Sequence, residues 1–352
     1  MELTFKPDFE DTRCRWDAFW KGENSRPLLA ATLPRPGIEP VEKPRYGAGY
    51  DGNFTPVIDQ LLRWAESLEF LGDAIPFFYL EFGADHFATL LGADMVFPYE
   101  GRDAGWAVPF VKDWDTVELR FRRDSRWWEQ TVRFAEALRA RCEGALLIAA
   151  PTLVANLDAL AAVRGPQNLL LDLVLCPEAV QRALTQVNAA HAEILQALGE
   201  LLQFDRYGSI NRHGMYSRGK INVPQCDFSC MISPAMFREF AIPALAQEMA
   251  RLDAVEYHLD GPDALRHLEA LCVLDKLDVI QWVPGAGAPS QQDWNWLYQK
   301  IDALGKGQFR WADPETGKRV WRNYRVRKQF FTVSVSSRAE FETLCKEVEW
   351  EK

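Results

Sequence analysis

The sequence contains no apolar run close to the roughly 20 residues that a membrane-spanning helix needs. Its first residues, MELTFKPDFEDTRCRW, are charged throughout and lack the apolar core of a secretory signal. These two absences argue against a membrane span and a secretory signal, and we expect a cytoplasmic protein.

Positive charge and paired cysteines are also scarce. The chain has 40 lysines and arginines against 50 acidic residues, a net charge of -10. Because an acidic surface repels phosphate backbones, nucleic acid is not expected as a partner. The seven cysteines are scattered, as is typical of reduced thiols. No Walker loop, GxSxG, HExxH or dinucleotide fingerprint stands in a suitable context. We therefore expect a small-molecule substrate and chemistry outside these motif classes.

What is present is an alternation of short apolar segments with amphipathic helical stretches, without a linker that marks a domain boundary. Alternating strands and helices predict a parallel α/β sheet. Eight such strands in a chain of 352 residues predict a (β/α)8 (TIM) barrel, with a doubly wound open sheet as the alternative. Residues 35–73 and 99–143 fit neither pattern and are expected as helical or loop insertions. The predicted strands span 26–34, 74–83, 145–153, 208–214, 254–261, 278–285, 307–314 and 329–337.

Polar residues collect at the carboxyl ends of these strands, where barrel enzymes carry their chemistry. Four of them are carboxyl or imidazole groups that suit catalysis, and Asp227 stands just ahead of a helix start. The others suit substrate binding by hydrogen bonds, charge or stacking. The catalytic candidates are Asp260, His258, Asp227 and Glu81, and the substrate-binding candidates are Arg212, His213, Asn211, Gln281, Trp282, Trp311 and Arg35.

The stretch YHLDGPDALRHLEAL, residues 257–271, is the most informative part of the chain. His258 and Asp260 are two apart on a predicted strand, so their side chains point to the same face. A helix is predicted to follow at once, and its positive N-terminal end favours an ionised Asp260 or a substrate anion. The alternative is that Asp260 caps the helix and His258 supports it.

Several stretches together resemble the uroporphyrinogen decarboxylase superfamily, which includes zinc-dependent methyltransferases that serve corrinoid proteins. The matching stretches are LDALAAVRGPQNLLLDLVLCPEAV (157–180), CDFSCMISPAMFREFAIPAL (226–245) and YHLDGPDALRHLEAL. With RWDAFWKGENSRPLLA and IQWVPGAG, the chain looks similar to an uncharacterised bacterial branch labelled "trimethylamine corrinoid protein 2"-like. The resemblance implies a single barrel domain over residues 1–352, with residues 1–25 as an N-terminal helical extension.

The resemblance also implies where a metal would bind. The methyltransferases of this superfamily hold zinc with a His-x-Cys pair on this strand and a later cysteine. Here His258 matches the histidine, Asp260 stands in place of the first cysteine, and Ser334 and Ser336 lie where the later cysteine is expected. Zinc accepts nitrogen and carboxylate ligands, so a site on His258 and Asp260, with Glu81 as a further candidate, is expected.

Two enzyme functions and one binding function follow from these residues. The first is a methyltransferase with a corrinoid or thiol acceptor, the corrinoid being carried by a partner protein. The second is a metal-free hydrolase or lyase, for example on glycosides, in which Asp260 works with Asp227 or Glu81. The third is a non-catalytic binder that keeps the barrel. Tetrapyrrole decarboxylation is disfavoured, because RPLLAATLPRPG offers only Arg26 and Arg35 where the decarboxylases carry their arginine motif. A homodimer is the expected assembly.

Overall fold

The computed structural model describes residues 1–97, 105–315, 318 and 321–349. Its strands form one large sheet and three smaller pairs. Apolar and β-branched residues fill the long strands, as is usual for strands covered on both faces. The strands are β1 (Leu28–Pro34), β2 (Leu68–Gly72), β3 (Phe77–Tyr79), β4 (Asp94–Val96), β5 (Trp106–Val108), β6 (Leu147–Ala149), β7 (Ser209–Ile210), β8 (Tyr216–Ser217), β9 (Ile221–Asn222), β10 (Ala254–Asp260), β11 (Val279–Val283), β12 (Gly307–Ala312) and β13 (Gln329–Val333).

Helices follow most of the strands. The α-helices are α1 (Phe9–Lys21), α2 (Phe54–Glu66), α3 (His86–Leu90), α4 (Arg126–Cys142), α5 (Leu157–Arg164), α6 (Pro166–Leu175), α7 (Pro177–Leu201), α8 (Phe204–Tyr207), α9 (Pro234–Met236), α10 (Ile242–Ala250), α11 (Leu268–Cys272), α12 (Asn295–Ala303) and α14 (Arg338–Glu347). A π-helical turn, η3 (Phe237–Ala241), joins α9 to α10. The 3-10 turns are η1 (Trp114–Thr116), η2 (Asp227–Met231), η4 (Pro262–His267), η5 (Gln291–Asp293) and η6 (Trp321–Asn323).

The large sheet has seven strands in the order β2-β1-β13-β12-β11-β10-β9. All its neighbours are parallel except β2, which pairs antiparallel with β1. Strands β3 and β6 form a separate parallel pair. The predicted α/β fold is therefore confirmed. Among the described residues, no ladder of backbone hydrogen bonds joins the β3–β6 pair to the large sheet. Closure into an eight-stranded barrel therefore stays a prediction.

The first residues of the strands meet in one apolar cluster that α1 covers. Phe9, Trp16 and Phe19 of α1 are fully buried there. They pack on side chains from the large sheet and the smaller strand pairs, and the strand members include Leu28, Leu147, Ile210, Ile221, Ala254, Val279, Phe309 and Phe330. Because α1 fills the N-terminal ends of the strands, the carboxyl ends remain for a functional site.

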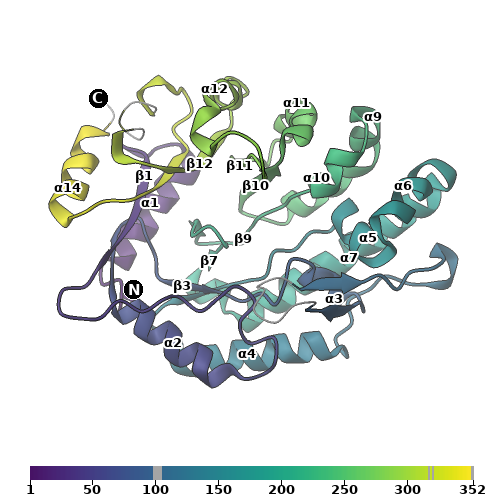
Figure 1. The fold of residues 1–352 in the computed structure, drawn as a ribbon, viewed down its shortest axis with the longest axis horizontal. Helices are drawn as coiled ribbons and strands as arrows, with labels where there is room; N and C mark the ends of the chain where they lie inside the picture. The colour runs from purple at the N-terminus through teal and green to yellow at the C-terminus, as the bar shows by residue number, and fades with distance from the viewer. Residues whose placement is uncertain (98–104, 316–317, 319–320, 350–352) are drawn as a thin grey trace.

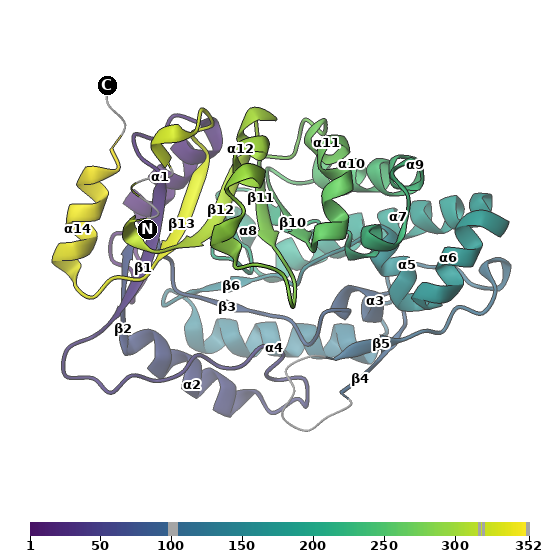
Figure 2. The ribbon, with the colours of Figure 1, turned by 45° about the horizontal axis from the view of Figure 1, so that its top comes forward.

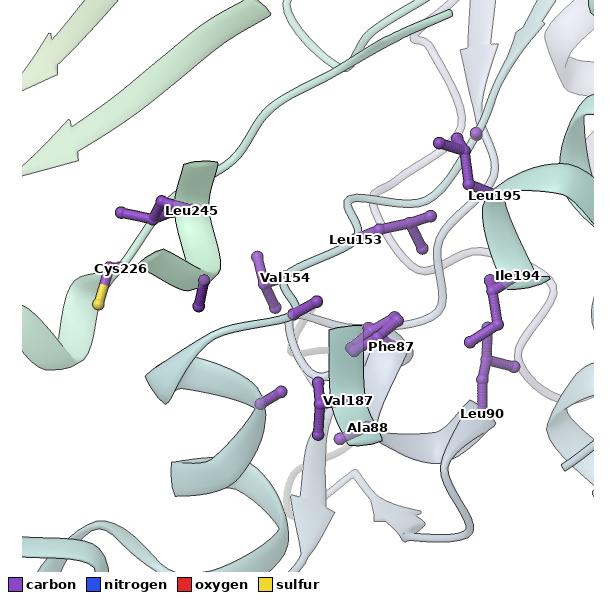
Figure 3. Close-up of a cluster of buried hydrophobic side chains, with 14 of the residues drawn as sticks. Phe87, Ala88, Leu90, Leu153, Val154, Val187, Ile194, Leu195, Cys226 and Leu245 are labelled. Carbon is purple, nitrogen blue, oxygen red and sulfur yellow. The ribbon is translucent and has the colours of Figure 1, made fainter. Parts of the chain in front are cut away.

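Helices cover the outside of the strands (Figure 1). Helices α10, α11 and α12 lie along β10 to β12, and α2 and α4 lie together near β3 and β6 (Figure 2). A second core forms where α3 meets α7. Figure 3 shows Phe87 beside Val187, with Leu153 and Val154 above them. This core fixes the chain that follows β6, which carries part of the candidate site. In the described part of the chain, no helix has the length and apolar character to cross a membrane.

Two expectations about the strands need correction. The segment 208–214 is not one parallel strand, because β7 turns back antiparallel into β8. The turn forms because the Asn211 side chain accepts hydrogen bonds from the backbone N–H groups of His213 and Met215, and Gly214 adopts a φ of 80°. The parallel neighbour of β10 is instead β9. The two predicted insertions also contain strands besides helices. Strand β2 lies in 35–73 with α2, and strand β5 lies in 99–143 with α4.

Candidate metal and proton-transfer site

Strand β10 presents a column of ionisable side chains. Glu256, His258 and Asp260 alternate along it, and successive side chains of a strand point to opposite faces, so these three share one face. Glu256 is fully buried, whereas His258 and Asp260 are half-buried toward the end of the strand. The predicted pairing of His258 with Asp260 on one face is thus observed, and Glu256 extends it deeper into the protein.

Asp227 joins His258 and Asp260 to form the metal cluster, the name used below for these three residues. One ligand atom of each residue lies within 4.8 Å of the other two. Asp227 begins the turn η2 just after β9, and the bridge between Gln225 and His258 brings this segment alongside β10. Among the described residues this is the one group of three His, Cys, Asp or Glu side chains close enough to share an ion.

The third member of the cluster, Asp227, is predicted by the sequence as a catalytic residue and not as a metal ligand. Ser334 and Ser336 are exposed, and the Ser336 hydroxyl donates to Glu340 at the start of α14. Glu81 is not a member either, because its carboxylate is occupied by other donors. The turn η2, rather than β13 or β3, supplies the carboxylate, and no local sequence signal connects Asp227 to a strand 30 residues later.

The cluster contains an unsatisfied oxygen that a cation would suit. Oδ1 of Asp260 is buried and has no hydrogen-bond partner. Burial raises the pKa of Asp260, and the charge of Arg212 lowers it by a smaller amount. The sequence predicted that a helix N-terminus keeps Asp260 ionised. The chain instead continues as the 3-10 turn η4, and burial has the larger effect. One imidazole and two carboxylates fit the donor set of zinc.

His258 is held neutral. Burial lowers its pKa to about 3, and the charge of Arg212 acts in the same direction. Its Nδ1 bonds to Oε1 of Gln281, which faces it from β11. Since an amide oxygen only accepts, Nδ1 carries the hydrogen and Nε2 keeps its lone pair. A neutral imidazole with a free Nε2 is the form that binds metals.

A second group of residues surrounds Glu81. Its carboxylate accepts hydrogen bonds from the Tyr46 hydroxyl at 2.5 Å, the Thr152 backbone N–H at 2.7 Å and the Tyr79 hydroxyl. Glu81 is only 3% exposed, and burial raises its pKa to about 7 despite these donors and the charge of Arg212. A carboxyl group that titrates near neutral pH is suited to accept and return protons.

Arg212 is the charge that connects the two groups. Its charge lowers the pKa values of Glu81, Asp227 and Asp260 against the larger effect of burial. Its guanidinium donates to Gln225 Oε1 at 2.9 Å, and Gln225 Nε2 donates to Asp227 at 3.0 Å. Gln225 therefore bridges the arginine to the metal cluster.

His213 and Asn211 lie below Arg212 and hold Glu256. The carboxylate of Glu256 accepts from Asn211 Nδ2 at 2.5 Å and bonds to His213 Nδ1 at 2.9 Å. Nε2 of His213 accepts from Arg212 Nε at 3.3 Å. Asn211 and His213 thus form a buried polar network beneath the site. Glu256 was missed by the sequence reading, although its period-two spacing from His258 and Asp260 is a signal that could have found it.

The remaining candidates lie in three different places. Trp311, 42% exposed, stands edge-on to His213 with ring centroids 5.9 Å apart, so it borders the site. Trp282 is fully buried against Trp294 and does not present its ring to a ligand. Arg35 follows β1, and its side chain donates to the Leu68 carbonyl at 3.4 Å at the start of β2 rather than to the metal cluster.

Comparison with known proteins supports the fold but not a family. No protein-family model matches the sequence, and no curated protein matches it. Among solved structures, the chain is similar to a methyltransferase from Methanosarcina mazei, with a TM-score of 0.60. The two sequences are 9% identical, and the match covers 96% of this chain and 97% of that chain. The two proteins share a fold over nearly their full lengths, and the resemblance to the uroporphyrinogen decarboxylase superfamily stays a prediction.

Proposed function

We propose that this protein is a metal-dependent methyltransferase whose metal is held by Asp227, His258 and Asp260. The observation that carries the proposal is the buried, unpartnered Oδ1 of Asp260 within that cluster. A buried oxygen without a partner costs free energy that a bound cation would recover. Three protein ligands also leave a coordination position for a substrate, as in catalytic zinc sites.

The metal-free alternative has less support. Retaining glycosidases place their two carboxyl groups about 5 to 5.5 Å apart, and inverting enzymes place them farther apart. Ligand atoms of Asp227 and Asp260 lie within 4.8 Å of each other and of the His258 imidazole, and an imidazole beside two carboxylates is a metal-ligand set rather than a carboxylate pair. Trp282 is buried and cannot stack on a sugar ring.

The proposed reaction transfers a methyl group from a corrinoid, carried by a partner protein, to a thiol. A zinc ion on the metal cluster would lower the pKa of the acceptor thiol. The thiolate sulfur forms the new bond to the methyl carbon as the cobalt–carbon bond breaks, and the electron pair of that bond stays on cobalt. Glu81, whose pKa is raised to about 7, is the residue proposed to take up the thiol proton. Arg212 offsets the negative charge of the surrounding carboxylates.

The structural similarity to the methyltransferase from Methanosarcina mazei supports this proposal at the level of fold, since barrel-like α/β folds host many chemistries. The residues of the metal cluster carry the specific part of the argument. Carboxylate oxygens, such as those of Asp260 and Asp227, are harder metal ligands than thiolate sulfur. We therefore expect weaker activation of a thiol than in a cysteine-rich zinc site.

The first test is metal content of the protein purified without chelator and without added metal. We expect roughly one zinc per chain in the wild type and loss of that zinc in His258→Ala, because the imidazole is the only nitrogen ligand of the cluster. His191→Ala removes a buried histidine of α7 that is not part of the metal cluster. It serves as the control for loss of an imidazole. Metal-free protein that takes up no zinc on titration would contradict the proposal.

The second test is chemical and uses methylcobalamin with a small thiol. We expect zinc-dependent demethylation, followed by the change in cobalamin absorbance, and its loss in Asp260→Asn. Full turnover in Asp260→Asn would show that Asp260 is structural and that the reaction lies elsewhere.

A further inference from the structure

A cavity of about 420 Å³ opens beside the metal cluster and is not used by the function proposed above. Asp227 lies in its wall, so the cavity and the cluster share this residue. Elements from distant parts of the chain form it: the segment after β3, strand β5, helix α5 and the turn η2. Its volume suits a small organic molecule.

The described walls of the cavity are acidic, and Gln225 in the wall connects Asp227 to the guanidinium of Arg212. Asp85, Asp158 and Asp227 line the cavity, and none of the described lining residues is lysine, arginine or histidine. Backbone groups hold two of these carboxylates in place. Asp85 accepts from the Ala107 N–H at 2.9 Å, and Asp158 accepts from the N–H groups of Asp227 at 2.9 Å and Phe228 at 2.8 Å. Backbone donors therefore fix the positions of these two carboxylates. Burial raises the pKa of all three lining carboxyl groups, so a mildly alkaline pH favours their ionised forms.

The three carboxylates are too far apart to hold one metal ion between them. Of the described residues, the group compact enough to share an ion is Asp227 with His258 and Asp260, and neither Asp85 nor Asp158 belongs to it. A larger cation, with its positive charge inside an organic head group, can face all three carboxylates.

The rest of the wall suits such a head group. Trp106 and Met231 are large apolar side chains that remain 43% and 46% exposed, and both line the cavity with Phe228. Exposed apolar surface of this size in a concave wall indicates a ligand. Tryptophan is the strongest aromatic partner for an organic cation, and thioether and proline surfaces pack against its alkyl groups.

We propose that this cavity binds an organic ammonium ion, with its charge near Asp85 and Asp158 and its alkyl groups on Trp106, Met231 and Phe228. The shared residue Asp227 places the ligand next to the metal cluster. The binding of this ligand does not depend on the proposed methyltransferase function.

Binding is tested with two probes of the same shape, choline and its uncharged carbon analogue 3,3-dimethylbutan-1-ol. Calorimetry on protein treated with a chelator measures binding without the metal, at low ionic strength and one mildly alkaline pH. We expect choline to bind at least about tenfold more tightly than the neutral analogue. Equal affinity for the two probes, or no choline binding, would overturn the proposal.

Variants inside and outside the cavity lining test whether choline binds in this cavity. Trp106→Leu removes the exposed aromatic face and should weaken choline binding about tenfold with little effect on the neutral probe. Trp296→Leu removes a 54% exposed tryptophan from α12, outside the cavity lining, and should leave binding unchanged. Asp85→Asn gives a second variant that removes charge alone. Unchanged choline binding in both cavity variants would refute the assignment.

The same experiment separates the two proposals. Choline binding in a protein that takes up no zinc would leave the cavity established and contradict the methyltransferase function. Zinc-dependent demethylation of methylcobalamin without choline binding would support the methyltransferase and contradict the ammonium site proposed for the cavity.

Discussion

Oε1 of Gln281 accepts a hydrogen bond from Nδ1 of His258 across the parallel strands β10 and β11. The amide of Gln281 has only one orientation, because its Nε2 donates to the Trp282 carbonyl at 3.3 Å. The imidazole tautomer is therefore set by a fully buried neighbour. The sequence predicted Gln281 as a substrate-binding residue, and we now propose that it positions His258.

This relationship predicts the effect of removing Gln281. Gln281→Met should lower zinc affinity by about 10- to 100-fold, because such partners of a ligating histidine hold its tautomer and orientation. Competition with a chromophoric chelator measures the affinity, and the nitrogen chemical shifts of His258 report the tautomer. Gln308→Met, which replaces a buried glutamine on β12, should leave both unchanged. Wild-type affinity and tautomer in Gln281→Met would refute the positioning role.

The identity of the third ligand gives a second prediction. Asp227→Asn should weaken zinc binding, whereas Ser336→Ala should not, because Asp227 belongs to the cluster and Ser336 bonds to Glu340. Metal content after dialysis against a weak chelator compares the two variants. If Ser336→Ala lost zinc and Asp227→Asn kept it, the third ligand would lie on the segment where the family resemblance places a cysteine.

The raised pKa of Glu81 should make the stability of the protein depend on pH. This pKa is raised from 4.5 to about 7, so between these pH values the folded protein binds a proton that the unfolded chain has released. This contribution to the free energy of unfolding is present below pH 4.5 and is lost as the pH rises through 7. Glu81→Gln removes the titration and should flatten this part of the profile by at most about 3 kcal/mol.

Denaturant unfolding of wild type and Glu81→Gln at several pH values measures the difference. Tyr46→Phe is the informative companion, because the Tyr46 hydroxyl lowers the pKa of Glu81 and its loss should move the wild-type transition to higher pH. Parallel profiles for wild type and Glu81→Gln would mean that Glu81 does not titrate in this range.

The buried carboxylate of Asp73 connects helix α1 to the large sheet, and its removal should destabilise the protein. Its fully buried carboxylate accepts from Arg15 Nε at 2.5 Å, Arg26 at 2.8 Å and the Leu29 backbone N–H at 2.8 Å. Asp73→Asn leaves the two arginines without their partner and should cost about 3 to 5 kcal/mol. Asp59→Asn breaks the exposed pair with Arg141 and should cost at most about 1 kcal/mol.

The pH dependence of stability gives a second test of the role of Asp73. Burial acts to raise the pKa of Asp73, but Arg26 and Arg15 lower it below its ordinary 3.8. Its contribution to stability is therefore present above pH 3.8 and is lost as the pH falls through the lower, folded value. Equal unfolding free energies for Asp73→Asn and Asp59→Asn would contradict the anchoring role of Asp73.

The sequence predicted well those features that depend on local pattern. The apolar segment 254–261 became β10, and its period of two placed His258 and Asp260 together. The same period also places Glu256 on this face, deeper in the strand. The single strand predicted for 208–214 is wrong, because the hydrogen bonds of the Asn211 side chain and the positive φ of Gly214 turn the chain back into β8.

The sequence by itself determined the alternation of strands and helices, the acidic character of the chain, and the His-x-Asp pair that ends β10, because periodicity and composition are local properties. Only the tertiary structure decided which residues complete the site. Asp227, Arg212 and Glu81 lie on different segments, and their proximity arises from the packing of strands far apart in the chain. The acidic cavity around Asp85 and Asp158 has the same origin, since its walls come from four separate segments and no single segment carries its pattern.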